Sequence, residues 1–89
     1  MQTLHLIISG KVQGVFFRAK AKVEAEKYGI TGWIKNTQDK KVEALITGEP
    51  AMLDIFVSWC RRGPEKAKVD EVIVSEHAAN SFNAFEILR

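Results

Sequence analysis

A glycine-containing segment near the N-terminus holds the residues whose types and spacing best suit an anion. Residues 10–18 read Gly-Lys-Val-Gln-Gly-Val-Phe-Phe-Arg. Glycines let successive backbone N–H groups turn toward a ligand, and a following helix would add partial positive charge at its N-terminus. Arg18 can donate two hydrogen bonds to one phosphate group. The segment therefore predicts a phosphate-binding loop, although it lacks the Lys-Ser/Thr end of a nucleotide P-loop. On composition alone, a tight turn with a surface arginine is the commoner explanation.

Hydrophobic periodicity predicts the elements that must position this loop. Residues 3–8 alternate as a strand, and residues 17–28 carry Phe17, Ala21, Ala25 and Tyr28 at helical spacing before Gly29. Residues 31–36 and 42–47 flank a polar turn at 37–40 and predict a β-hairpin. A second helix is expected from Pro50 to Gly63, with an inward stripe of Met52 or Leu53, Phe56, Trp59 and Cys60. A strand at 69–76 and a short strand marked by Phe85 and Ile87 complete the order.

This order of elements predicts an α+β fold. It is βαββαβ plus a short C-terminal strand, the ferredoxin-like two-layer α/β sandwich, with an antiparallel sheet and two helices on one face. The helical crossover makes the first two strands parallel, and the hairpin returns the third strand between them. The C-terminal ends of the first two strands therefore meet at one edge of the sheet. We expect the 10–18 loop and Asn36 to face a single ligand there, roughly 10 Å across.

Length, composition and charge bound the possible classes of protein. The 89 residues predict a single domain over 1–89, and 46% hydrophobic with 27% charged residues is typical of a globular protein. A net charge of +2 falls short of the basic footprint of a nucleic-acid binder. The apolar stretch at residues 4–8 is too short for a signal peptide or a membrane span. Cys60 is the sole cysteine, which excludes an intramolecular disulfide and favours a cytoplasmic protein. We also expect a monomer.

Two motifs in the chain resemble the signatures of the acylphosphatase family. Residues 10–18 are similar throughout to the first signature. The second is resembled by Gly-Trp-Ile-Lys-Asn at 32–36, followed by Asp39 and Val-Glu-Ala at 42–44, at the expected distance from the first. The similarity extends over essentially the whole chain, including Gly48, Gly63-Pro64 and residues 85–87. It implies a ferredoxin-like fold and a metal-independent hydrolase that cleaves the carboxyl-phosphate bond.

The resemblance also implies a set of site residues. It places the catalytic arginine at Arg18 and the catalytic asparagine at Asn36. Backbone amides form the substrate-binding cradle, at Gln13, Gly14, Val15, Phe16, Phe17 and Arg18. The implied substrate is a small-molecule acyl phosphate, with inorganic phosphate as product and competitive inhibitor, and with no cofactor, metal, nucleic acid or membrane partner. Lys40 departs from the family's usual glycine, so we expect Asp39 to adopt the positive φ of the turn, or the loop to be longer.

The proposed chemistry is consistent with the residues present. No cluster suggests a strong general acid or base, and an acyl phosphate needs little help, because its leaving carboxylate has a conjugate-acid pKa of about 4. Arg18 and the amides would stabilise the phosphoryl oxygens, while Asn36 would orient the attacking water. Thr37 could steady the Asn36 amide, but a turn-forming role fits it better.

Other residues that could do chemistry favour structural roles. His5 and His77 lack acidic or cysteine neighbours at ligand spacing, which argues against a metal site. Cys60 falls on the inward stripe of the second helix and is expected to be a buried structural thiol. Trp33, Phe16 and Phe17 are expected to pack beside the core in preference to stacking on bases.

Two alternative functions remain open on sequence grounds. The same order of elements occurs in RNA-recognition domains, although the mid-strand aromatic motif of those domains is missing. The chain could also be a non-catalytic phosphate-binding module of the same family, like the acylphosphatase-like part of hydrogenase-maturation proteins. A titration against RNA at physiological salt tests the first alternative, and a turnover assay tests the second.

Overall fold

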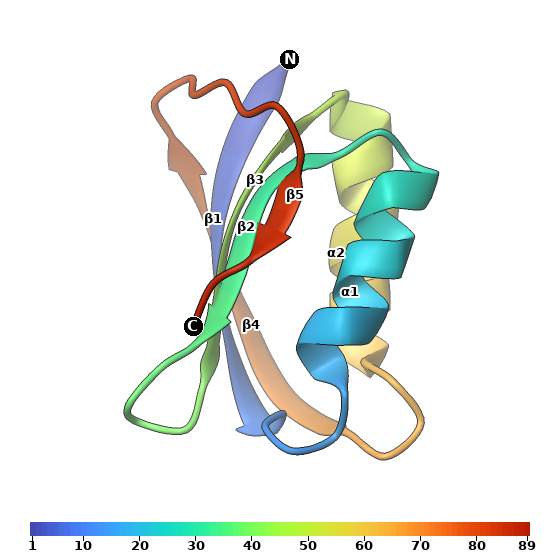
Figure 1. The fold of residues 1–89 in the computed structure, drawn as a ribbon, viewed down its shortest axis with the longest axis vertical. Helices are drawn as coiled ribbons and strands as arrows, with labels where there is room; N and C mark the ends of the chain where they lie inside the picture. Colours follow the sequence, from blue (N-terminus) through green and yellow to red (C-terminus); the bar gives the residue numbers. More distant parts are fainter.

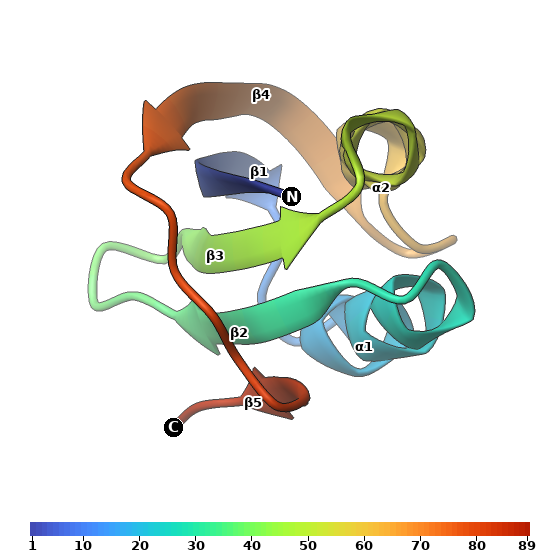
Figure 2. The ribbon, with the colours of Figure 1, turned by 90° about the horizontal axis from the view of Figure 1, so that it is seen from above.

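The computed structural model describes residues 1–89, which form a five-stranded sheet with two helices on one face (Figures 1 and 2). The elements are β1 (Gln2–Lys11), α1 (Phe17–Lys27), β2 (Thr31–Asn36), β3 (Val42–Gly48), α2 (Pro50–Arg62), β4 (Lys68–His77) and β5 (Phe85–Ile87). This order confirms the predicted βαββαβ arrangement with a short C-terminal strand. Both helices begin where the sequence placed them, α1 at Phe17 and α2 at Pro50.

The strands lie in the order β4-β1-β3-β2-β5. Because β3 pairs antiparallel with both β1 and β2, those two strands are parallel to each other, as predicted. β5 is different, since it pairs with β2 in parallel register and makes the sheet mixed. The expectation of an antiparallel sheet therefore holds for β1 to β4 only.

The parallel pairing of β5 follows from the path of the chain after β4. Residues 78–84 cross from the β4 edge of the sheet to the β2 edge (Figure 2). Hydrogen bonds at Asn80 fix this crossing, since its N–H donates to Thr3 Oγ1 at 3.1 Å and its carbonyl accepts from Thr47 Oγ1 at 2.8 Å. β5 consequently starts at the same end of the sheet as β2 and runs beside it.

The hydrophobic core lies between the helices and the sheet. The predicted inward stripes are confirmed for Phe17, Ala21 and Ala25 of α1 and for Leu53, Phe56 and Cys60 of α2, all buried. Tyr28, Met52 and Trp59 are half-buried at the margin of this cluster. Burial of such side chains is the main source of stability in a domain that no disulfide links. Neither helix is long and apolar enough to span a bilayer.

The end of β1 is shaped to start the glycine-containing loop. The register of β1 against β4 shifts between Ser9 and Gly10, and Gly10 has a φ of 125°. A Cβ at Gly10 would lie 2.1 Å from the Lys68 carbonyl oxygen, which is far inside van der Waals contact. Glycine therefore lets β1 stay close to β4 while the chain turns toward α1.

Candidate active site

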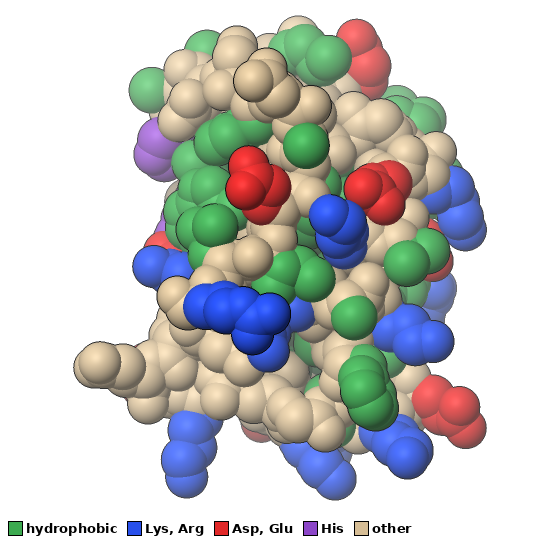
Figure 3. All heavy atoms as spheres, viewed as in Figure 1, with side chains coloured by type: hydrophobic (Ala, Val, Ile, Leu, Met, Phe, Trp, Pro, Cys, Tyr) green, Lys and Arg blue, Asp and Glu red, His purple; other side chains and the backbone are tan.

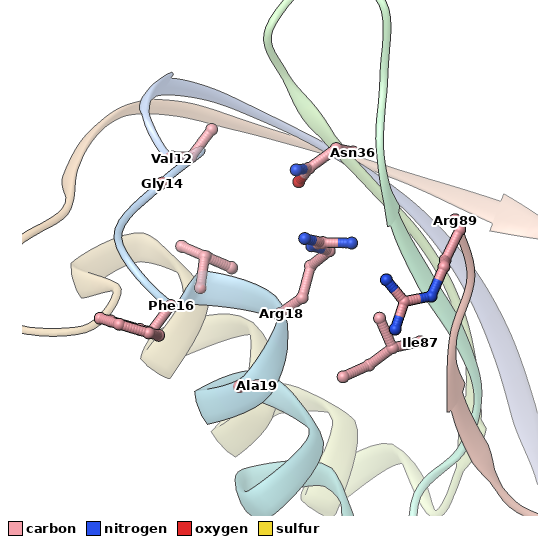
Figure 4. Close-up of a pocket in the computed structure, with 9 residues that line it drawn as sticks. Val12, Gly14, Phe16, Arg18, Ala19, Asn36, Ile87 and Arg89 are labelled. Atoms are coloured by element: carbon pink, nitrogen blue, oxygen red, sulfur yellow. The ribbon is translucent and has the colours of Figure 1, made fainter.

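A cavity of about 350 Å³ lies where the C-terminal ends of β1 and β2 meet the start of α1 (Figure 4). Nine residues line it: Val12, Gly14, Phe16, Phe17, Arg18, Ala19, Asn36, Ile87 and Arg89. The structure thus brings together Arg18 and Asn36, which the topology predicted would face one ligand. The expected meeting of the two strand ends is confirmed.

Arg18 reaches the cavity from the first turn of α1. Its guanidinium group points toward the side chain of Asn36 across the cavity (Figure 4). No carboxylate lies within ion-pair distance of it, so its charge is available to an incoming anion. A planar guanidinium in this state can bind two oxygens of one phosphoryl group.

Asn36 is the last residue of β2, and its side chain faces the same cavity. Its Oδ1 atom is buried and has no hydrogen-bond partner, the only such side-chain atom in the chain. Buried polar atoms are nearly always satisfied in folded proteins, so an unpartnered acceptor beside a cavity points to a ligand or a water. A hydrogen-bond donor such as a water molecule would satisfy this oxygen.

The loop between β1 and α1 leaves its backbone donors free. None of the backbone N–H groups of residues 13–18 donates to an acceptor within the chain. Gly14 and Phe16 have positive φ values of 73° and 64°, and no side chain caps the N-terminus of α1. Left-handed residues within such a loop create concavities lined by N–H groups. The loop therefore has the form of an anion cradle, with the helix dipole behind it.

Two of the six predicted cradle residues do not line the cavity with their side chains. Val15 is buried in the core, and the Gln13 side chain turns toward the β2–β3 hairpin. There Gln13 Nε2 donates to the carbonyl oxygens of Thr37 at 3.0 Å and Lys41 at 2.8 Å. Val15 and Gln13 can therefore contribute only their backbone N–H groups to the cradle. The Gln13 side chain instead links the loop to the hairpin that carries Asn36.

The hairpin turn itself differs from the expectation. Lys40 has the positive φ, at 68°, whereas Asp39 does not. The reason lies in the Asp39 carboxylate, which accepts a hydrogen bond from Thr37 Oγ1 and so holds Asp39 within the turn. This hydrogen bond is the main cause that lowers the pKa of Asp39. Thr37 also accepts from the Lys41 N–H at 3.0 Å and makes no bond to Asn36, so it is a turn residue, as expected.

The two adjacent phenylalanines of the loop have opposite environments. Phe17 is buried and packs edge-to-face on Trp59, with ring centroids 5.4 Å apart, as predicted. Phe16 is 69% exposed beside the cavity, so the expectation that it packs against the core is wrong. Its left-handed backbone conformation, just before α1, turns its side chain outward. Trp33 is half-buried on the sheet, and Lys35 Nζ lies 5.4 Å from its ring centroid.

Two cavity residues, Ile87 and Arg89, were missed on sequence grounds. They come from β5 and the residues after it, which lie next to β2 at the edge of the sheet. The alternation of Phe85, Ile87 and Arg89 on one side of the strand was the available signal. It could not be used because the neighbour of the final strand was unknown.

The cavity is positively charged. Its lining includes two arginines and no acidic residue. Lysine and arginine side chains also predominate over the lower half of the face in Figure 3, around the start of α1 and the C-terminal end. This distribution favours a dianionic ligand over a neutral one.

The remaining candidate residues lie away from the cavity. His5 Nε2 lies 2.6 Å from Glu43 Oε2 on the open side of the sheet, and no three His, Cys, Asp or Glu side chains gather as a metal site. Cys60 is fully buried, and burial raises the pKa of its thiol, which keeps it protonated and unreactive. Its structural placement agrees with the prediction.

Comparisons with known proteins agree with this geometry. The family model for acylphosphatase matches residues 4–87. An acylphosphatase of Marinobacter nauticus is 49% identical over 72 residues, covering 81% of this chain and 78% of the relative. The crystal structure of acylphosphatase from Bacillus subtilis superposes with a TM-score of 0.96 at 34% identity and covers all of both chains. Full-length HypF in its phosphate- and nucleotide-bound form has a TM-score of 0.89 at 25% identity, and the match covers 99% of this chain and 12% of HypF. The chain therefore belongs to the acylphosphatase family and is an enzyme that hydrolyses the carboxyl-phosphate bond of acyl phosphates.

Proposed function

We propose that the hydrolysis of acyl phosphates is carried out by two side chains, Arg18 and Asn36, over a cradle of loop amides. The observation that carries this proposal is the meeting, in one cavity, of an unpaired guanidinium group and a buried, unpartnered amide oxygen. The products are a carboxylate and inorganic phosphate.

The phosphoryl group binds between Arg18 and the loop. Arg18 donates to two of its oxygens, and the free N–H groups of residues 13–18 donate to the others. These donors are fixed before the substrate arrives, so they need little reorganisation as charge moves during the reaction. A protein that catalyses phosphoryl transfer does so mainly by such positioning and charge stabilisation.

Asn36 holds the attacking water. Its Oδ1 accepts a hydrogen bond from the water, which leaves a lone pair of the water directed at phosphorus. An amide is neutral and so does not repel the dianionic phosphoryl group, as a carboxylate would. The proton of the water passes to a phosphate oxygen, so the reaction needs no strong general base.

The leaving group departs without a general acid. Its carboxylate has a conjugate-acid pKa of about 4, so it is stable as an anion at neutral pH. In an in-line displacement it leaves on the side of phosphorus opposite the water held by Asn36. We also propose that no metal ion takes part, because the Arg18 guanidinium group and several amide donors supply the charge stabilisation.

Inorganic phosphate should compete with substrate, since the cradle recognises the group that both share. The proposal extends to a monomeric, cytoplasmic enzyme of one domain that binds neither nucleic acid nor a membrane. The buried, reduced Cys60 and the modest net charge of +2 support it.

The experiment that tests this assignment compares Arg18→Lys and Arg18→Ala with the wild type on benzoyl phosphate. Both variants should lose kcat/KM by at least about tenfold, because lysine retains the charge but not the two-pronged contact. Lys20→Ala, which removes one charge from the exposed side of α1, is the control and should stay near wild type. Near-normal kinetics in Arg18→Lys would contradict bidentate recognition. A wild type that binds phosphate without turnover would instead favour the non-catalytic module.

A further inference from the structure

The proposed mechanism leaves one polar side chain of the cavity unused. Among the lining residues, the polar side chains are Arg18, Asn36 and Arg89, and the first two have been assigned. Arg89 makes no ion pair and no hydrogen bond with its side chain. An unpaired guanidinium group that faces a substrate cavity is a candidate for recognising a second anionic group.

The pairing of β5 with β2 places Arg89 on the cavity side of the sheet. The parallel register matches Phe85 with Gly32 and Ile87 with Ile34, so continued in step it brings the backbone of Arg89 beside that of Asn36. The Leu88 N–H donates to the Ile34 carbonyl at 2.8 Å and holds the chain to β2 beyond the end of β5. Side chains alternate along a strand, so Arg89 faces the same side as the buried Phe85.

Figure 4 shows at which end of the cavity the Arg89 side chain lies. Its side chain extends from beside β2 toward Ile87, and its guanidinium group lies next to Ile87 and not next to Gly14. The phosphoryl cradle lies at the Gly14 end, and the water is held by Asn36. Because the leaving group must depart opposite the water, the acyl group extends away from Asn36 along the wall that includes Ala19 and Ile87.

We propose that Arg89 is a specificity-determining residue that binds an anionic substituent on the acyl group of the substrate. The inference rests on the proposed function, because it takes the orientation of the acyl group from the water on Asn36. Ala19 and Ile87 supply apolar surface for the carbon skeleton, and Arg89 supplies a cation at its far end. The substrates favoured are acyl phosphates that carry a second carboxylate, over equally large acyl phosphates with a neutral end.

Rigid aromatic substrates test the proposal. The probes are 4-carboxybenzoyl phosphate and 4-methylbenzoyl phosphate. The 3-carboxy and 3-methyl compounds form a second pair, in which the substituent lies at a different distance from the phosphoryl group. In wild type and Arg89→Gln, the measured quantity is the ratio of kcat/KM for the carboxy over the methyl substrate. Glutamine should lower this ratio about three- to tenfold, the range for an exposed to part-buried charged contact. The decrease should shrink at high salt.

Arg62→Gln is the matched control, because Arg62 is also unpaired and lies on a different groove between the outer sides of α1 and α2. It removes the same charge and should keep the ratio at its wild-type value. An equal fall in Arg62→Gln would reduce the effect to net charge and overturn the proposal. A ratio unchanged in Arg89→Gln for both substitution patterns would overturn it too.

Two further measurements distinguish binding of the acyl substituent by Arg89 from binding of the phosphoryl group, and from the role assigned to Asn36. If Arg89→Gln raises the inhibition constant of inorganic phosphate as much as it lowers the ratio, then Arg89 holds the phosphoryl group and the proposal is wrong. The non-hydrolysable 4-carboxy- and 4-methylbenzoylphosphonates report binding by calorimetry without turnover. If Arg89→Gln loses the preference for the carboxy compound in that assay, the role of Arg89 is supported even if the mechanism assigned to Asn36 fails. If Arg89→Gln retains the preference, the role of Arg89 is contradicted.

Discussion

Replacing Gln13 with alanine should damage catalysis through the position of Asn36, although Gln13 presents no side chain to the cavity. The Gln13 amide nitrogen donates to the carbonyl oxygens of Thr37 and Lys41, at 3.0 and 2.8 Å. These are the only side-chain hydrogen bonds from the loop to the hairpin that carries Asn36. In the proposed mechanism the loop binds the phosphoryl group and Asn36 holds the attacking water, so the contact between loop and hairpin would set the distance between the two reactants.

The structure gives the size of the effect. Two neutral hydrogen bonds contribute about 1 to 3 kcal/mol together. Both carbonyls have second donors, because the Lys40 N–H bonds Thr37 at 3.3 Å and the Thr37 N–H bonds Lys41 at 2.9 Å. Neither acceptor is left alone, so the loss of stability should be at the low end, about 1 to 2 kcal/mol. A misplacement of 1 Å at a reaction centre can cost about a hundredfold, so partial loosening should lower kcat about tenfold.

The assay combines a melting curve with kinetics measured well below the melting temperature, where Gln13→Ala remains folded. Gln2→Ala is the control, because Gln2 makes only one long, exposed contact with Glu76, at 3.5 Å. The control should change neither quantity appreciably. A Gln13→Ala protein that loses stability but keeps the wild-type kcat would refute the positioning role and leave Gln13 as a structural residue.

Three other predictions follow from the structure. Lys40→Gly should stabilise the protein by about 0.5 to 1 kcal/mol, because glycine removes the cost of a side chain at positive φ, whereas Lys40→Ala should give no such gain in a melting experiment. The Cys60 thiol should react with a thiol reagent only as fast as the protein unfolds, because burial raises its pKa and excludes the reagent, and fast labelling of native protein would contradict its position. Chelators should leave acyl phosphate hydrolysis unchanged, and loss of activity that a divalent cation restores would show that a metal takes part.

The sequence predicted the elements and their order because each element carries a clear local signal. Ala21 and Ala25 repeat at helical spacing, and Gly63 follows α2 at a φ of 71°, as a helix terminator should. The parallel relation of β1 and β2 then followed from chain connectivity alone. From it came the meeting of Arg18 and Asn36, which requires no knowledge of side-chain packing.

Features that depend on non-local contacts could not be predicted. The parallel position of β5 is set by Asn80, which bonds to Thr3 and Thr47 far away in sequence, so Arg89 could not be assigned to the cavity. The outward turn of Phe16 depends on a backbone conformation that its residue type disfavours. Lys40 is at positive φ for the same kind of reason, since the Thr37–Asp39 hydrogen bond decides which turn residue reverses the chain.

The most direct test of the mechanism is the kcat of Asn36→Ala for benzoyl phosphate. Removal of one positioned polar group at a transition state should lower kcat about a hundredfold, roughly 3 kcal/mol. The inhibition constant of inorganic phosphate should stay within a few-fold, because Arg18 and the loop amides still bind the phosphoryl group. Asn83→Ala, at an exposed asparagine away from the cavity, should leave kcat unchanged. A folded Asn36→Ala protein with the wild-type kcat would remove Asn36 from the reaction and contradict the mechanism.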